Sequence, residues 1–299
     1  MRYGYFLRET QGLDPIGDLR DQIAQAAADG YSSAWLSHIF GLDAITALAA
    51  AGAGGPGIEL GTAVVPTYPR HPAVLAQQAM TANAALGGRF ALGIGLSHQI
   101  VIENMYGLSF ERPGRHMKEY LDILVPAGRG EPVTYDGETL KADIKLTGPG
   151  VGFPVLVAAL GPRMLRLAGT VADGTVLWMT GPKTIAGHIT PTITAAAAEA
   201  GREPPRIVCA LPVCVTDDAA AALDRANQIF EIYGQLPSYR AMLDREGAAN
   251  PGDVAIVGDE ETVLAKLREL ERAGVTDFVA SVYAERERTR NLLIGAAKG

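Results

Sequence analysis

The stretch LGTAVVPTYPRHPAVLAQQA, residues 60–79, begins as an apolar strand and resumes as a helix after an interruption. Pro66 and Pro69 break up the end of the strand, because proline cannot donate the hydrogen bond that a central strand needs. The helix then begins at Pro72, which suits a first helical turn, and His71 can cap it. This order predicts a buried strand that ends in a shaped loop and leads into a helix.

The same alternation of apolar strands and helical patterns continues on both sides of this stretch. Strands are expected over residues 2–7, 33–38, 58–65, 90–97, 153–160, 174–180, 206–215 and 275–281. Helices are expected over residues 14–30, 43–52, 72–86, 111–128, 218–233 and 259–274, with another after Gly161-Pro162 and a charged one at the end. The strands are apolar throughout, as parallel strands covered on both faces are.

Eight strands, each followed by helical material, predict an α/β fold: a (β/α)8 TIM barrel with insertions, in one domain over residues 1–299. A doubly wound open sheet is the alternative, but the chain after the first strand has no glycine-rich turn. Residues 131–142 carry a hairpin signal, Asp136-Gly137, and are expected to lie outside the main repeat. Residues 234–258 are interpreted as an irregular segment, in which Tyr239 and Arg240 either form part of a lid or cover the barrel end.

Composition narrows the classes of function. The net charge of −7 argues against nucleic acid as a partner, and no apolar run is long enough to predict a membrane span. Cys209 and Cys214 would face opposite sides of one strand, so they predict neither a disulfide nor a metal site and fit a reducing cytoplasm. The beginning of the chain lacks a signal-peptide pattern. We therefore expect a cytoplasmic protein whose partner is a small molecule.

In barrels of this kind the active site lies at the carboxyl ends of the strands. The residues expected there are 8–9, 37–38, 62–67, 95–98, 160–163, 179–181 and 215–217. They include no close pair of carboxylates, no metal-ligand spacing and no Ser/His/Asp pattern. The chemistry is therefore expected to come from a bound cofactor.

Gly161-Pro162 is the most informative element for a ligand. The free N–H groups and the dipole of a helix start form an anion site, and Arg163 adds positive charge. Ser97 and Thr180, at two other strand ends, can also reach a phosphate. An ordinary turn between a strand and a helix is the alternative, but three such elements together favour phosphate binding.

Two residues are candidates for catalysis. His38 ends the second strand at the expected catalytic face, where it either transfers a proton or is satisfied by a backbone partner. Glu9 follows the first strand and is either a second catalytic group or a solvated loop residue.

The stretch from residue 60 to GGRFALGIGLSH, residues 87–98, closely resembles the luciferase-like monooxygenase superfamily, and within it the enzymes that use the deazaflavin coenzyme F420. GYSSAWLSHIFGLDA, VLVAALGPRMLRLAGTVADGTVLWMTGP and VAIVGDEETVLAKLRELERAGVTDFVAS resemble the same superfamily, so the resemblance covers nearly the whole chain. FMN-dependent members share the central block. The abundance of arginine over lysine, 20 to 6, suggests a GC-rich genome and favours deazaflavin.

The resemblance implies a bulge with a non-prolyl cis peptide at Ala63-Val64, which backs the cofactor ring, and a phosphate site at Ser97, Leu160, Gly161 and Thr180. The full set of cofactor-binding residues that we expect is Thr62, Ala63, Val64, Gly95, Ser97, Leu160, Gly161, Arg163 and Thr180. His38 matches an active-site base of some deazaflavin dehydrogenases. Those enzymes usually have Asp before this histidine, whereas this chain has Ser37, so the usual orienting carboxylate is absent.

The resemblance therefore predicts an F420-dependent oxidoreductase that transfers a hydride between deazaflavin and a small organic substrate with a C=C, imine or carbonyl/alcohol group. An FMN-dependent luciferase-like monooxygenase is the alternative, and a flavin-binding barrel without turnover is a third possibility. A basic rim of Arg163, with Arg112 and Arg115, would help to capture the acidic tail of F420. No metal site is expected. The protein is expected to form a homodimer.

Overall fold

The structure, a computed structural model, describes residues 1–10 and 12–298. Its strands are β1 (Arg2–Phe6), β2 (Ser33–Leu36), β3 (Glu59–Thr62), β4 (Val65–Pro66), β5 (Phe90–Gly95), β6 (Val133–Asp136), β7 (Lys141–Ile144), β8 (Val155–Val157), β9 (Gly174–Trp178), β10 (Arg206–Val215), β11 (Ile256–Gly258) and β12 (Asp277–Val282). Its helices are α1 (Pro15–Asp29), α2 (Ala44–Gly52), α3 (Pro72–Ala85), α4 (Pro113–Gly128), α5 (Pro162–Thr170), α6 (Pro182–Thr184), α7 (Thr190–Glu199), α8 (Ala219–Gln235), α9 (Pro237–Glu246), α10 (Glu260–Arg272) and α11 (Arg286–Lys298), with π-helical turns η1 (Ile100–Met105) and η2 (Ile185–Ile189) and a 3-10 turn η3 (Pro251–Val254).

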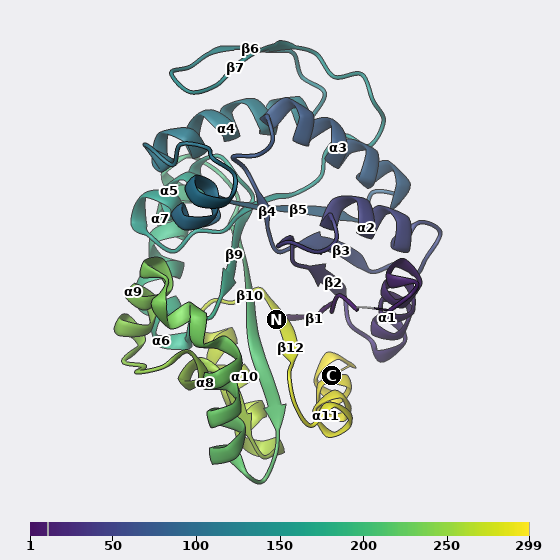
Figure 1. Ribbon diagram of the computed structural model, residues 1–299, viewed down its shortest axis with the longest axis vertical. Helices are drawn as coiled ribbons and strands as arrows, with labels where there is room; N and C mark the ends of the chain where they lie inside the picture. Colours follow the sequence, from purple (N-terminus) through teal and green to yellow (C-terminus); the bar gives the residue numbers. More distant parts are fainter. Residues whose placement is uncertain (11, 299) are drawn as a thin grey trace.

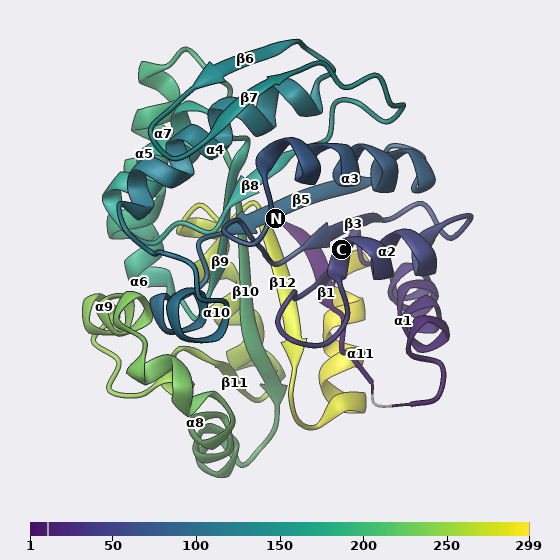
Figure 2. The same ribbon diagram turned by 45° about the horizontal axis from the view of Figure 1, so that its top comes forward.

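Eight parallel strands close into a barrel. They pair in the order β1, β2, β3, β5, β8, β9, β10 and β12, and β12 pairs with β1 to complete the ring. The helices surround this ring, and α11 returns to pack beside α1 (Figures 1 and 2). There Arg290 of α11 bonds Asp29 of α1 at 2.5 and 2.6 Å. The predicted (β/α)8 barrel is confirmed.

The hairpin of β6 and β7 forms a separate two-stranded antiparallel sheet beyond α4, at the top of Figure 1, as expected. Glu119 of α4 fixes its turn, because the Glu119 carboxylate accepts the backbone N–H groups of Glu138, Thr139 and Leu140 at 2.8–3.0 Å. Burial of this carboxyl acts to raise its pKa, but the hydrogen bonds of Thr139 and its neighbours outweigh burial and lower the pKa to about 2.

Two expectations about the second half of the chain are wrong. The segment before β11 is not irregular, because it contains α9, whose Tyr239 and Arg240 are helical. Residues 215–217 do not lie with the other strand ends. β10 is long enough to extend past the ring: its last pair with β9 is Ala210 with Trp178, and Val215 pairs with Gly258 of β11.

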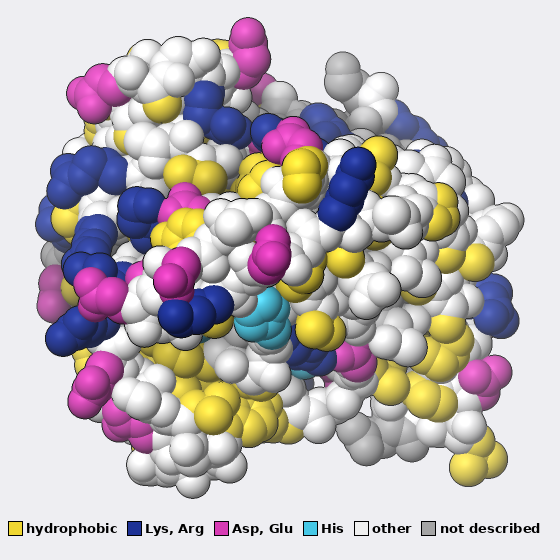
Figure 3. Space-filling view, turned by 90° about the horizontal axis from the view of Figure 1, so that it is seen from above, with side chains coloured by type: hydrophobic (Ala, Val, Ile, Leu, Met, Phe, Trp, Pro, Cys, Tyr) yellow, Lys and Arg dark blue, Asp and Glu magenta, His cyan; other side chains and the backbone are white. Residues whose placement is uncertain are grey.

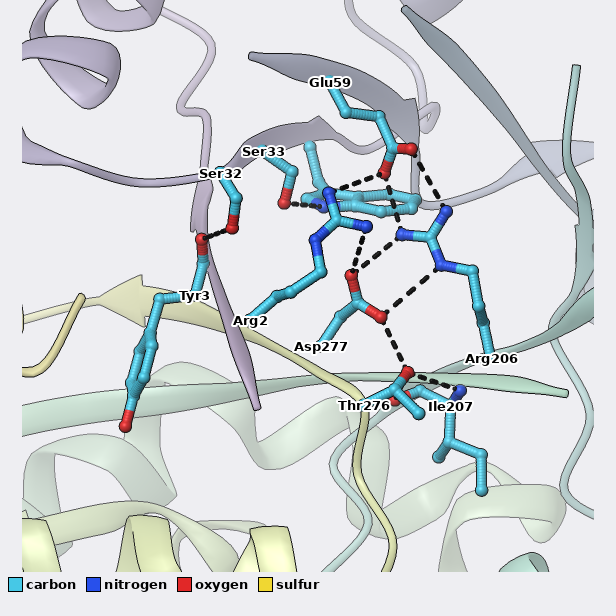
Figure 4. A network of polar contacts seen from close by, with 10 residues as sticks. Arg2, Tyr3, Ser32, Ser33, Glu59, Arg206, Ile207, Thr276 and Asp277 are labelled. Atoms are coloured by element: carbon cyan, nitrogen blue, oxygen red, sulfur yellow. Dashed lines mark hydrogen bonds and ion pairs between the residues drawn. The ribbon is translucent and has the colours of Figure 1, made fainter. Parts of the chain in front are cut away.

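An ion-pair network closes the amino end of the barrel (Figure 4). Arg206 of β10 bonds Glu59 of β3 at 2.8 and 3.1 Å and Asp277 of β12 at 2.8 Å. Arg2 of β1 lies 3.7 Å from Glu59 and 3.2 Å from Asp277. Burial acts to lower the pKa of Arg206, but the two carboxylates raise it, so the guanidinium stays charged. Each of these four residues is the first residue of its strand. We call Arg2, Glu59, Arg206 and Asp277 the amino-end network.

The barrel interior above this network is apolar. Trp35 of β2 is fully buried there, and its indole N–H donates to the Ser33 hydroxyl at 2.9 Å. The inward-facing side chains of neighbouring strands pack around it, namely Ala91, Leu156, Val176, Val208, Ala210 and Val279. The interior is thus filled from the amino end upward, which leaves the carboxyl end for a ligand.

Candidate functional site

The end of β3 contains a bulge. Gly61 pairs with Ala91 and Val65 pairs with Ile94, so four steps along β3 and β4 match three steps along β5. One extra residue in one strand defines a β-bulge, and bulges are frequent beside active sites. The Ala63-Val64 peptide bond lies inside it and is cis, which confirms the expectation from the resemblance.

The side chain of Thr62 fastens this bulge to β5. Its hydroxyl donates to the Gly93 carbonyl oxygen at 2.8 Å and accepts the Gly93 N–H at 2.9 Å. A side-chain hydroxyl therefore replaces the backbone ladder at the position where the extra residue interrupts it. Thr62 is fully buried, so it supports the bulge from behind.

Two glycines of β5 leave room for the bulge. A Cβ added at Gly93 would overlap with the Thr62 carbonyl oxygen. A Cβ added at Gly95 would lie 2.7 Å from Cγ2 of Val64, which is closer than real Cβ contacts come. Gly95 is one of the expected cofactor-binding residues, and its lack of a side chain makes room for the side chain of Val64.

Four partly exposed residues cover the apolar interior at its carboxyl end. Ala63 and Val64 of the bulge pack on the interior cluster together with Phe6, the last residue of β1, and Trp178, the last residue of β9. We call these four residues the platform. A largely apolar surface at this depth suits the face of a planar ring system.

The loop after the bulge is held by a buried histidine. His116 of α4 contacts the Thr67 hydroxyl through Nε2 at 3.0 Å and stacks on the Tyr68 ring, with centroids 3.9 Å apart. The Thr67 N–H in turn donates to the Gly95 carbonyl oxygen at 2.9 Å. Burial lowers the pKa of His116 to about 4, so its ring is neutral near pH 7.

This histidine predicts an acid-labile fold. The unfolded chain binds a proton at His116 more readily than the folded chain does, so stability is fully present above pH 6.5 and is lost as the pH falls toward 4. Between pH 6.5 and 4.5 the free energy of unfolding should fall by about 2 kcal/mol from this residue. Urea denaturation at both pH values measures the fall, and His116→Gln should reduce it. An equal fall in the variant would assign the acid lability to other groups.

His38 lies at the end of β2, and its side chain is 11% exposed. The Ala44 N–H at the start of α2 donates to Nδ1 of His38 at 3.2 Å, so the neutral ring carries its proton on Nε2. Burial lowers the pKa of His38, the Arg70 charge lowers it further, and Asp43 opposes them. The neutral form with a free Nε2–H is therefore the form near pH 7.

A carboxylate does approach His38, although Ser37 replaces the usual aspartate. Asp43 Oδ2 lies 3.9 Å from Nδ1 of His38. This carboxylate is already engaged, because it caps α2 by accepting the Thr46 N–H at 2.9 Å and pairs with Arg70 at 2.5 Å. Asp43 thus contributes charge beside His38 without orienting its proton.

Glu9 makes a structural contact. Its carboxylate accepts the backbone N–H of Leu42 at 3.3 Å and lies against Gly41, in the loop between β2 and α2. The side chain ties the loops after β1 and β2 together. No described contact links it to His38.

The expected anion site is open. α5 begins after Gly161 as predicted, and a Cβ added at Gly161 would meet no other heavy atom within 4 Å. Ser97 at the end of β5 and Met179 at the end of β9 have φ angles of 61° and 51°, in the left-handed region. Non-glycine residues in this region cluster at functional sites, and these two flank β8 on either side.

Leu160 and Thr180 differ in what they offer to an anion. The Leu160 carbonyl oxygen is occupied by Nε2 of His188 at 2.8 Å. Thr180 is fully buried, and its hydroxyl donates to the Trp178 carbonyl oxygen at 3.1 Å. Thr180 therefore presents no hydroxyl at the surface in this arrangement, whereas Ser97 is partly exposed.

The basic residues near α5 form only part of the expected rim. A Cβ added at Gly114 would overlap with the guanidinium group of Arg163, so Arg163 lies against the first turn of α4. Arg112 and Arg115 both pair with Glu138 of the hairpin turn, which offsets part of their charge. Figure 3, viewed from the side of the hairpin, shows Lys and Arg side chains gathered on its left, interspersed with acidic ones.

A separate cavity of about 590 Å³ lies at the other end of the barrel, where β8 and β10 begin. Arg129, Phe153, Asp173, Arg202 and Arg206 are among the residues that line it. That end of a (β/α)8 barrel contributes stability rather than catalysis, so we do not place the active site there.

Within residues 1–10 and 12–298, no group of three His, Cys, Asp or Glu is arranged to hold a metal ion. No helix in the same residues has the length and apolar content to cross a bilayer.

Sequence reasoning missed several residues of this site. The fastening role of Thr62, the space at Gly93 and the approach of Asp43 all depend on contacts between separate strands or loops. Trp178 ends the run GTVLW, and a tryptophan at the last inward position of a barrel strand could have marked it.

Comparison with known proteins shows the family to which this chain belongs. A model of the family described as luciferase-like monooxygenase matches residues 1–277. A 5,10-methylenetetrahydromethanopterin reductase of Methanolobus tindarius is 29% identical, and the match covers 89% of this chain and 90% of that protein. An F420-dependent glucose-6-phosphate dehydrogenase of Nakamurella multipartita is 32% identical over 58% of this chain and 55% of its own length.

Solved structures share the fold at lower identity. The coenzyme F420 dependent tetrahydromethanopterin reductase of Methanopyrus kandleri superposes with a TM-score of 0.81 at 23% identity, covering 98% of this chain and 97% of its own. The oxygenating constituent of 3,6-diketocamphane monooxygenase from Pseudomonas putida, in complex with FMN, has a TM-score of 0.79 at 20% identity and covers 100% and 97%. Barrels of this shape thus serve both cofactors.

Proposed function

Because the chain belongs to the luciferase-like monooxygenase family, we propose that it is a coenzyme F420-dependent oxidoreductase that transfers a hydride between the deazaflavin and a small organic substrate. As a member of this class, it is an oxidoreductase that depends on F420 or on a flavin. The observation that carries the choice of F420 is the likeness to F420-dependent proteins: the F420-dependent glucose-6-phosphate dehydrogenase is 32% identical over 58% of this chain, and the coenzyme F420 dependent reductase shares the fold over 98% of it.

The residues of the site fit such a cofactor. The platform offers an apolar face for a planar ring, and the open start of α5 at Gly161 offers N–H groups and a helix dipole for its phosphate. Ser97 and Arg163 would add a hydroxyl and a positive charge. The bound reduced deazaflavin would supply a hydride and a proton, and a ketone, imine or activated C=C acceptor would gain both.

His38 would act as a hydrogen-bond donor. Its Nδ1 is occupied by the Ala44 N–H, so the Nε2–H is the group available to a substrate. A neutral histidine whose pKa is lowered can polarise a carbonyl oxygen in this way. The same tautomer cannot accept a proton at Nε2, which disfavours the general-base role implied by the resemblance.

Substitution of His38 should separate the two roles. Removing a donor that stabilises developing negative charge costs roughly 100-fold in kcat at buried sites, so His38→Ala should lose roughly 10- to 100-fold without loss of cofactor binding. His38→Gln retains an N–H donor and should lose much less. Equal losses in both variants would indicate a base, and an unchanged rate in His38→Ala would show that the ring only packs.

The FMN-dependent monooxygenase is the second candidate, because an FMN complex shares the fold. Titration with F420 and with FMN, followed by quenching of tryptophan fluorescence, tests the proposal. F420 should bind more tightly, and its affinity should fall with ionic strength because surface charge contacts with its acidic tail are screened. Tight, salt-insensitive binding of FMN, with oxygen consumption when reduced FMN is added, would establish the monooxygenase instead. Binding without turnover of any acceptor would leave a flavin-binding barrel.

A further inference from the structure

Arg70 occupies the carboxylate that lies beside His38. It stands in the loop between β4 and α3, and its guanidinium pairs with Oδ2 of Asp43. The other oxygen of Asp43, Oδ1, accepts the Thr46 N–H at 2.9 Å and the side-chain amide N–H of Gln78 at 3.3 Å. Both oxygens are thus engaged by donors other than His38, although Oδ2 lies 3.9 Å from Nδ1 of the His38 ring.

The Asp43 carboxylate, if released, would offer His38 a second arrangement. A neutral imidazole carries one proton, and the hydrogen bond made by one ring nitrogen fixes which nitrogen carries it. Nδ1 of His38 accepts the Ala44 N–H at 3.2 Å, so the proton stands on Nε2. A carboxylate only accepts hydrogen bonds, so a bond from His38 to Asp43 would need the proton on Nδ1 and leave a lone pair on Nε2. The first arrangement makes His38 a donor at Nε2, and the second makes it a base.

We propose that Arg70 is a positioning residue that fixes the tautomer of His38, because it holds the Asp43 carboxylate and keeps it from accepting a proton from Nδ1. This inference rests on the proposed function for the donor role of His38, and it states how that role is secured. The charges around the ring act in the same sense. Besides burial, the Arg70 charge lowers the pKa of His38, whereas the Asp43 charge raises it.

The loop that carries Arg70 is held by backbone contacts that do not need its side chain. The Arg70 N–H donates to the Thr67 carbonyl oxygen at 3.2 Å. The Arg70 carbonyl oxygen accepts the hydroxyl of the buried Tyr120 at 2.9 Å. Without the guanidinium, Asp43 would still cap α2 through Oδ1. Substitutions of the Arg70 side chain therefore test its effect on His38 with the loop in place.

Nitrogen NMR of the full chain, labelled at histidine and without cofactor, measures the tautomer directly. The chain has five histidines, and the ring signals absent from His38→Gln belong to His38. In the wild type the proton should stand on Nε2. In Arg70→Met it should move to Nδ1, because the freed Oδ2 of Asp43 can accept it. The pKa of His38, followed by titration of the same signals, should rise by at least about 1 pH unit, since the cation is lost and the carboxylate remains.

Two further variants separate the carboxylate from a general disturbance of the loop. Arg70→Lys keeps a cation and its N–H donors, so it should keep the proton of His38 on Nε2. The double variant Arg70→Met, Asp43→Asn keeps a side chain that caps α2 but has no charge to draw the proton to Nδ1. It should return the proton to Nε2. Thermal unfolding checks the fold of each variant, and Arg70→Ala, a second side chain without charge, should give the same tautomer as Arg70→Met.

The outcomes separate this inference from the proposed function. A proton that stays on Nε2 in Arg70→Met and Arg70→Ala, or one that stays on Nδ1 in the double variant, would overturn the role of Arg70. Binding of FMN in place of F420, or the absence of turnover, would overturn the proposed function alone, because the NMR spectra require neither cofactor nor substrate.

Discussion

The Gly93→Ala variant should be less stable than the wild type by about 3 kcal/mol, because a well-packed backbone has to move to admit the new methyl group. The added Cβ would overlap with the Thr62 carbonyl oxygen, which is main chain and cannot rotate away. Any shift that relieves the overlap also breaks the two hydrogen bonds between the Thr62 hydroxyl and Gly93. Urea denaturation measures the loss, and cofactor affinity should fall with it because Ala63 and Val64 move.

Gly57→Ala is the matched control for this change. Gly57 stands just before β3, and a Cβ added there would meet no heavy atom within 4 Å. The same substitution should therefore change the free energy of unfolding by less than about 0.5 kcal/mol. Equal stability of the Gly93 and Gly57 variants would mean that the bulge yields easily and that Gly93 does not define it.

Gly161→Asp should weaken cofactor binding by at least about 100-fold while leaving the fold as stable as before. Aspartate is a favourable residue before a helix and complements the helix dipole, so α5 should gain rather than lose stability. The carboxylate would stand in the open space proposed for the phosphate. Two like charges about 4 Å apart repel by about 4 kcal/mol near a protein surface, which corresponds to more than 100-fold in affinity.

Gly161→Asn isolates the charge, because asparagine has nearly the same shape and also caps helices. It should lose less than about 10-fold in affinity, and the gap between the two variants should narrow as salt is added. Fluorescence titration gives both affinities, and thermal unfolding checks the fold. If both variants bind the cofactor equally well, the phosphate does not sit at the start of α5.

The barrel could be predicted from the sequence because its signals are local. Strand β10 matches the apolar run from 206 to 215, since a strand covered on both faces is apolar at every position. The first helix was bounded by residues that act within a few positions: Asp14 accepts the Gly17 N–H at 2.9 Å, and Gly30 has a φ of 93°. The family resemblance, not periodicity, supplied the cis peptide at Ala63-Val64.

The features that the sequence does not predict are of two kinds. Some depend on contacts between residues far apart in the chain, and others on proline and glycine residues that can either bound a helix or form a loop. The Thr62 hydroxyl bonds a residue 31 positions away, and no local pattern shows such a pair. Helix α9 lies in a segment whose proline and glycine residues are typical of loops, whereas in the structure Pro237 begins the helix and Gly247 caps it. The platform draws its four residues from three parts of the chain, so it exists only once the barrel has closed.

The amino-end network has a consequence for how this barrel can diversify. Its ion pairs join the starts of β1, β3, β10 and β12, and thus set how far each strand is advanced along the barrel axis (Figure 4). A slip of one residue would turn every side chain of a strand to the opposite face. Because that alignment is secured at one end, insertions and exchanges of loops at the other end leave the heights of the bulge, Trp178 and Gly161 unchanged. New substrate preferences can therefore arise by loop replacement, with alignment and chemistry inherited as separate traits.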